Sequence, residues 1–300
     1  MRMASSILFC LCLATSAARA ASPEDAYLAA RDKHISHIKA MEKAKASAEK
    51  VDAEQNKARA DLETRLRGLL GDVSVKGFPA AGKINLDSLS DQDEGFGMLD
   101  GLVYAEGGED GSRLVVTTRI LLDKWLAARA REKDEALRLP PDLAGALRLD
   151  PFYTFSISSG SGFTRSATLE VTPPEGAELV RAVLGGWAQD IGPNPNYSLV
   201  VTLVKGGRAY IGSMPPKTAI GKIAVCEEIW SQALQEVEKL RAAWRTSKRK
   251  DQMTFDADTK AEEKGDKDFH ACFMERAPKE PFYPALVKEA QELADRLAGK

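Results

Sequence analysis

A long stretch from Ser22 to Arg67, with no glycine and only one proline, constrains the fold of this chain most strongly. Ser22 can cap a helix with its side chain, and Pro23 suits the first helical position, where no backbone N–H is needed. Gly71 can then end the helix, because glycine readily adopts the left-handed backbone conformation that is common at helix C-termini. We therefore predict one long helix over residues 22–70, about 70 Å long at the usual rise per residue.

A helix of that length is marginal alone in water, so it must pack on another part of the protein. One of its faces repeats at steps of three and four residues, the coiled-coil period, with one extra four-residue step at Leu62. A second face, far downstream, repeats the same steps without error. The first face is Met41, Ala44, Ala48, Val51, Gln55, Ala58, Leu62, Leu66 and Leu69, and the second is Ile223, Cys226, Trp230, Ala233, Val237, Leu240 and Trp244.

Small side chains dominate the first face and bulky ones the second, a combination that can interlock. We therefore predict that residues 21–70 and 217–250 pair as a coiled-coil-like helical arm. Both helices join the same central body, so the pair must be antiparallel. The alternative interpretation is that each face packs separately on a globular core.

The central body, residues 71–216, has the pattern of an α+β domain. Alternating segments between turn residues predict strands at residues 83–86, 102–105, 113–117, 152–158, 163–171, 197–204 and 208–212. Helical periodicity predicts helices at residues 120–137, 142–147 and 175–187. Hairpins dominate, so we expect a hairpin-rich mixed or antiparallel sheet. Residues 251–300 are expected to form a charged segment and a C-terminal helix over residues 285–297.

Residues 1–20 have the three parts of a secretory signal peptide. Arg2 supplies the positive charge, an apolar run covers residues 7–14, and residues 18–20 form an A-x-A cleavage pattern, so Ala21 is the expected mature start. The apolar run is too short to span a membrane, and no later stretch reaches that length. An uncleaved anchor is the alternative. We expect a periplasmic or secreted protein without a transmembrane segment after cleavage.

Two of the four cysteines lie in the expected signal peptide, which leaves Cys226 and Cys272. An even pair in an oxidising compartment predicts one disulfide. Two unbridged buried thiols are the alternative, and a thiol nucleophile is a third possibility. The 42 basic and 44 acidic residues nearly balance, which gives no general attraction to nucleic acid.

The most site-like stretch is the Gly- and Ser-rich segment from Ser158 to Arg165. Its backbone N–H groups can face an anion, and Arg165 can add a positive charge. The candidate ligand-binding residues are Ser159, Gly160, Ser161, Gly162 and Arg165. The segment lacks the lysine of a phosphate-binding loop and the pattern of a nucleophile elbow, so a plain hairpin connection is the competing interpretation.

Two other groups of residues resemble metal ligands, and neither predicts a metal site. His34 and His37 lie one helical turn apart, but the sequence specifies no third ligand. The acidic run from Asp91 to Leu102 lacks the glycine and the final glutamate of a calcium loop. We therefore assign no metal and no cofactor.

No catalytic constellation is visible, so no catalytic residue is assigned and a non-enzymatic role is favoured. The first hypothesis is a cell-envelope interaction or structural protein that uses the helical arm for docking or self-association. The second is a hydrolase with its site near Ser161 and Arg165, and the third is a small-ligand or anion-binding module at the same loop. An exposed apolar stripe on the arm would favour the first, a base beside Ser161 the second, and convergent N–H groups with Arg165 the third.

Overall fold

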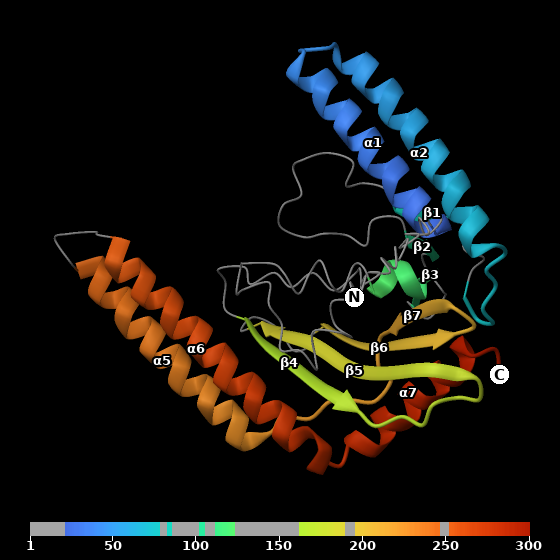
Figure 1. Cartoon of the computed structure of the whole chain (residues 1–300). Coiled ribbons are helices and arrows are strands. Elements are labelled where there is room, and N and C mark those ends of the chain that lie inside the picture. The colour runs from blue at the N-terminus through green and yellow to red at the C-terminus, as the bar shows by residue number, and fades with distance from the viewer. Residues whose placement is uncertain are drawn as a thin grey trace, which may run out of the picture.

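An antiparallel sheet forms the centre of the structure, and helices project from both of its ends (Figure 1). The computed structural model describes residues 22–78, 83–85, 102–105, 112–123, 162–189, 196–246 and 252–300. Within these residues the sheet has seven strands in the order β1-β2-β3-β7-β6-β5-β4. The chain is therefore a mixed α+β protein, as predicted.

The strands follow one another mostly through hairpins. They are β1 (Lys83–Asn85), β2 (Leu102–Ala105), β3 (Arg113–Thr118), β4 (Gly162–Leu169), β5 (Ala177–Gln189), β6 (Asn196–Lys205) and β7 (Arg208–Met214). Each of these except β5 coincides with a predicted strand. The β6–β7 turn uses Gly206 and Gly207, both at positive φ, as two adjacent glycines predict. The predicted strand at residues 152–158 lies outside the described residues.

The predicted helix at residues 175–187 is wrong, because this segment is β5. Three consecutive residues of β5, Ala182, Val183 and Leu184, are all buried. A strand covered on both faces has apolar residues in a row, and such a run resembles a buried helix in sequence. The adjacent Gly185 and Gly186 were the contrary signal, since glycine is unfavourable inside a helix.

The predicted single helix over residues 22–70 is also wrong, because the chain turns back on itself. Helix α1 (Pro23–Lys43) begins with the expected cap at Ser22, and α2 (Ala48–Leu70) runs antiparallel beside it (Figure 1). Between them Lys45 adopts a left-handed φ of 54°. A non-glycine residue rarely takes this conformation. Because the turn contains neither glycine nor proline, no typical turn residue marks it in the sequence.

The second arm helix pairs locally as well. Helix α5 (Ala224–Thr246) packs against α6 (Gln252–Arg276), and the two extend from the opposite end of the sheet to α1–α2 (Figure 1). The predicted pairing of residues 21–70 with 217–250 as one coiled-coil arm is therefore wrong. Trp230 of the second predicted face instead meets Phe269 of α6 edge-on, with ring centroids 5.7 Å apart.

One face of the sheet is covered by the last helix, α7 (Tyr283–Leu297), which follows the short 3₁₀ turn η3 (Ala277–Lys279). The buried face of α7 is Leu286, Ala290, Leu293, Ala294 and Leu297. A β-carbon built on Gly212 of β7 would lie 3.1 Å from Leu293 and Leu297. The missing side chain of Gly212 thus lets α7 approach the sheet closely.

Replacing Gly212 with valine should destabilise the protein by about 1–3 kcal/mol, because the new side chain overpacks this contact. The change would be measured as the free energy of unfolding in urea. Gly68→Ala is the control, since nothing lies within 4 Å of the added methyl group. That variant should be as stable as the parent or slightly more stable. A Gly212→Val protein as stable as the parent would show that α7 does not lie this close to β7.

Candidate functional site

The predicted ligand-binding loop is only partly within the described residues. Ser159, Gly160 and Ser161 lie outside them. Gly162 and Arg165 belong to β4, where they pair with Gln189 and Gly186 of β5, and their side chains are not described. The anion-binding loop therefore remains a prediction.

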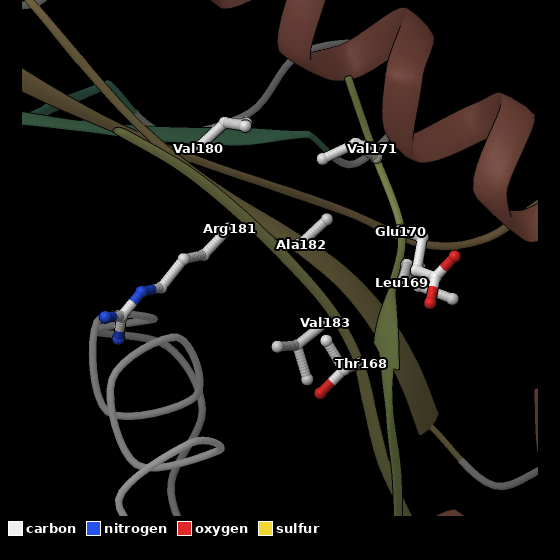
Figure 2. A pocket seen from close by; sticks show the side chains of 8 residues that line it. All are labelled: Thr168, Leu169, Glu170, Val171, Val180, Arg181, Ala182 and Val183. Carbon is white, nitrogen blue, oxygen red and sulfur yellow. The ribbon is translucent and has the colours of Figure 1, made fainter. Parts of the chain in front are cut away.

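A hollow of about 620 Å³ lies farther along the same strand, between the end of β4 and the start of β5 (Figure 2). Its walls are residues 168–171 and residues 180–183. The two strands are in register only as far as the pair Leu169–Ala182. The hollow is lined by the last two pairs of this ladder and by the residues just beyond them, where the two chains diverge (Figure 2).

Helix α7 holds the diverging end of β4 away from β5. The hydroxyl of Tyr283 donates to the carbonyl of Thr168, at 3.0 Å. The side-chain amide of Gln291 binds both backbone groups of Thr172, accepting from its N–H at 2.7 Å and donating to its C=O at 3.0 Å. Burial raises the pKa of Tyr283, and a hydrogen bond with the backbone of Glu170 partly offsets that rise.

The walls of the hollow combine apolar and charged side chains. Leu169, Ala182 and Val183 are buried, whereas Glu170 and Arg181 are exposed. Figure 2 shows the Glu170 carboxylate and the Arg181 guanidinium pointing to opposite sides. Within the described residues, neither Glu170 nor Arg181 forms an ion pair. Successive side chains of a strand point to opposite faces, so Arg181 lies on the other face of β5 from Val180 and Ala182 (Figure 2).

A serine and a histidine also meet near the sheet edge. The Ser166 hydroxyl of β4 is hydrogen-bonded to Nε2 of His270 on α6. A catalytic serine and the histidine that acts as its general base are joined by the same kind of hydrogen bond. However, Ser166 has no exposed surface, so a substrate from solvent does not reach its hydroxyl. The pair instead fastens α6 to β4.

The other two histidines lie between α1 and α2. Nε2 of His34 lies 3.0 Å from a carboxylate oxygen of Asp61, and Nε2 of His37 lies 3.8 Å from one of Glu54. Within the described residues, no three histidine, cysteine or acidic side chains gather as metal ligands. His34 therefore cross-links the hairpin by a hydrogen bond, whereas His37 is exposed and makes only the longer approach to Glu54.

The predicted disulfide is confirmed. Cys226 at the start of α5 is bonded to Cys272 near the end of α6, with their Cα atoms 5.7 Å apart. It closes the base of the α5–α6 hairpin. No helix in the described part of the chain has the length and apolar character needed to cross a membrane. The expected signal peptide, residues 1–20, lies outside the described residues.

Sequence reasoning could count the two cysteines, but it missed the hollow and the Ser166–His270 pair. Ser166 and His270 are 104 residues apart, and Gln291 is 119 residues from Thr172. Contacts over such separations leave no local pattern. Comparison with known protein families, with curated proteins and with solved structures finds no match to this chain.

Replacing both Cys226 and Cys272 with serine should lower the free energy of unfolding by about 4 kcal/mol, the loop-entropy value for a 46-residue separation. Urea unfolding of a chain that begins at Ala21 measures this change. A reductant should lower the stability of the parent to that of the double variant and leave the variant unchanged. Equal stability of parent and variant in oxidising buffer would contradict the bridge.

Asp61→Asn should destabilise the α1–α2 hairpin at neutral pH by less than about 1 kcal/mol, because the pair is partly exposed. Hydrogen bonds from Arg65 and then His34 hold the pKa of Asp61 below its usual value. The carboxylate therefore contributes its full stability above the unfolded-state pKa of about 4, and that contribution disappears as pH falls through the lower folded-state pKa.

The difference in unfolding free energy between the parent and Asp61→Asn should accordingly shrink between pH 7 and pH 3. Asp52→Asn is the matched control, since Asp52 is exposed on the same helix and has no partner within the described residues. A parent–variant difference at Asp61 that stays constant across this pH range would exclude the described ion pair.

Proposed function

We propose that this protein is an exported, non-enzymatic interaction protein of the cell envelope or extracellular space, and that its two helical hairpins contact a partner protein. The observation that carries the proposal is the projection of α1–α2 and α5–α6 away from the sheet at opposite ends (Figure 1). Each hairpin presents most of its length to solvent. Such elements add contact surface that the central core does not need.

The outer half of the α5–α6 hairpin is held together by its own charges. The Arg241 guanidinium bonds to Asp258 at 2.9 Å and to Glu262 at 3.2 Å. The hydrogen bond with Asp258 is the main reason that the pKa of Arg241 is raised. The disulfide closes the other end of the hairpin. A hairpin tied at both ends can carry a contact surface at a distance from the body.

The surface of the hairpins is polar. Some of their large apolar residues, such as Tyr27, Leu62 and Phe273, are buried, and others, such as Trp230, Leu234 and Trp244, are partly buried. The large apolar side chains that stand exposed in the described residues are Ile120 and Val225. These two form no stripe on an arm, so the exposed apolar stripe that would favour docking through a hydrophobic surface is not found in the described residues. The contact we propose therefore depends on hydrogen bonds and ion pairs, which favour specific and reversible association.

The disulfide, together with the absence of a membrane-spanning helix from the described residues, is compatible with a periplasmic or secreted location. The signal peptide expected at residues 1–20, with Ala21 as the mature start, is the sequence-based support for export. The hydrolase hypothesis places its site near Ser161, which lies outside the described residues. The Ser166–His270 contact does not supply such a site, because the hydroxyl of Ser166 has no exposed surface.

A photo-crosslinking amino acid at Lys57 of α2 or at Glu236 of α5 should form an adduct of defined mass in cells that produce the protein. Lys288 on the outer side of α7 is the control position, since its side chain is even more exposed. Lys239→Glu, three residues from Glu236, should weaken the α5 adduct, whereas Lys288→Glu should not. Adducts that are as frequent at Lys288 as on the hairpins would overturn the proposal.

A further inference from the structure

Helix α7 spans the sheet between the two helical hairpins. It packs against β4, β5, β6 and β7, four neighbouring strands of the sheet. Tyr283, its first residue, binds the backbone of Thr168 in β4, and Leu297 at its end reaches Gly212 of β7. Figure 1 shows α7 below the sheet, with its start near α6 and its end near the segment that follows α2. The helix therefore lies where it can hold both hairpins.

The start of α7 is tied to the α5–α6 hairpin. Residues 277–282 join α6 directly to α7. The Glu289 carboxylate of α7 accepts hydrogen bonds from the backbone N–H groups of Lys217 and Thr218, at 2.8 Å each. These two residues belong to the segment that leads from β7 into α5. Both chain segments that enter the hairpin from the body are thus fastened to α7.

The end of α7 is tied to the α1–α2 hairpin. The Arg296 guanidinium lies over the ring of Phe78, 4.4 Å from its centroid, and Phe78 belongs to the segment that follows α2. The backbone of Gly77, at a positive φ of 80°, lies against the same arginine side chain. From the sheet, Arg208 of β7 donates to the backbone carbonyl of Asp72, at 3.4 Å. The segment after α2 is thus held by α7 and β7 together.

One apolar core runs through the same elements. Its buried members include Tyr27 and Leu66 of the α1–α2 hairpin, Leu286 of α7 and Phe273 of α6. A close-packed core resists small displacements, because each shift opens voids or forces overlaps. A change in the angle between the two hairpins would therefore disturb the packing of α7.

A fixed angle matters for binding when both hairpins contact the same molecule. Both hairpins leave the sheet toward the same side, the upper left, in Figure 1. Once one of two linked elements is bound, the other meets the same molecule at a high effective concentration. Elements that are already held in the right orientation also avoid most of the entropic cost of ordering. Rigid coupling through α7 gives no such advantage to hairpins that bind separate molecules.

We propose that the two hairpins contact one partner molecule at the same time, at an angle that α7 fixes. The inference rests on the proposed function, since it concerns the same contact surfaces. It adds that the partner presents two contact sites whose separation matches that of the hairpins.

The distance between spin labels at Lys57 of α2 and Glu236 of α5, measured by electron paramagnetic resonance on the chain from Ala21, tests the fixed angle. The parent should give one narrow distance distribution. Arg208→Ala combined with Arg296→Ala should broaden it, because the segment after α2 then loses both of its contacts. Lys288→Ala, an exposed position on α7, is the matched control and should leave the distribution unchanged. Circular dichroism confirms that each variant is folded.

A broad distribution in the parent would overturn the fixed angle. A double variant with the narrow distribution of the parent would show that α7 and β7 do not set the angle, and would overturn the inference as well. Neither result depends on a partner, so neither bears on the proposed function.

Photo-crosslinking amino acids at Lys57 and Glu236 test whether the partner is shared. Adducts from the two positions should have the same mass, and a chain that carries both should capture one partner molecule. Arg208→Ala with Arg296→Ala should lower the yield of the Glu236 adduct, although neither arginine belongs to α5 or α6.

Adducts of different mass at the two positions would overturn this inference and leave the proposed function intact. A yield at Glu236 that is unaffected by the two arginine replacements would also overturn it. The absence of any adduct at both positions would overturn the proposed function and this inference with it.

Discussion

The contact of α7 with the sheet is the interaction on which the rest of this structure depends. Leu293 and Leu297 reach the bare backbone of Gly212, which brings the helix close to β7. The same helix uses Tyr283 and Gln291 to hold the end of β4. Its Glu289 accepts hydrogen bonds from the backbone N–H groups of residues 217 and 218, at 2.8 Å each. One helix at the end of the chain therefore fixes the sheet, the hollow and the segment that leads to α5.

Each long helix pairs with its neighbour in sequence, α1 with α2 and α5 with α6, and not with the distant helix that we expected. Joining α1 to α2 needs only the short turn around Lys45, whereas pairing α2 with α5 would first need the whole body to form. Loop-closure entropy favours the nearer partner. Alanine-rich faces fit either arrangement: Ala58 is fully buried in the α1–α2 hairpin that forms. Periodicity identified the helical residues but not their partner.

A feature of this structure could be predicted from the sequence when a few neighbouring residues determine it, and not when distant residues do. The glycine turn between β6 and β7, the cap at Ser22 and the cysteine pair are set by a few residues, and all three were predictable. The strand identity of β5 and the turn at Lys45 depend on tertiary burial and on an uncommon backbone conformation. The hollow depends on Gln291, more than a hundred residues away, so no sequence pattern at β4 could reveal it.

Each hairpin is only two helices thick, and this explains why it needs polar cross-links. Two helices side by side bury only one stripe each, so apolar packing alone leaves a long hairpin weak. The α1–α2 hairpin adds His34–Asp61, and the α5–α6 hairpin adds Arg241–Asp258 and the disulfide. Each cross-link stiffens a hairpin without placing apolar surface outside. The hairpins can therefore extend far from the body and still avoid the nonspecific association that an exposed apolar stripe would cause.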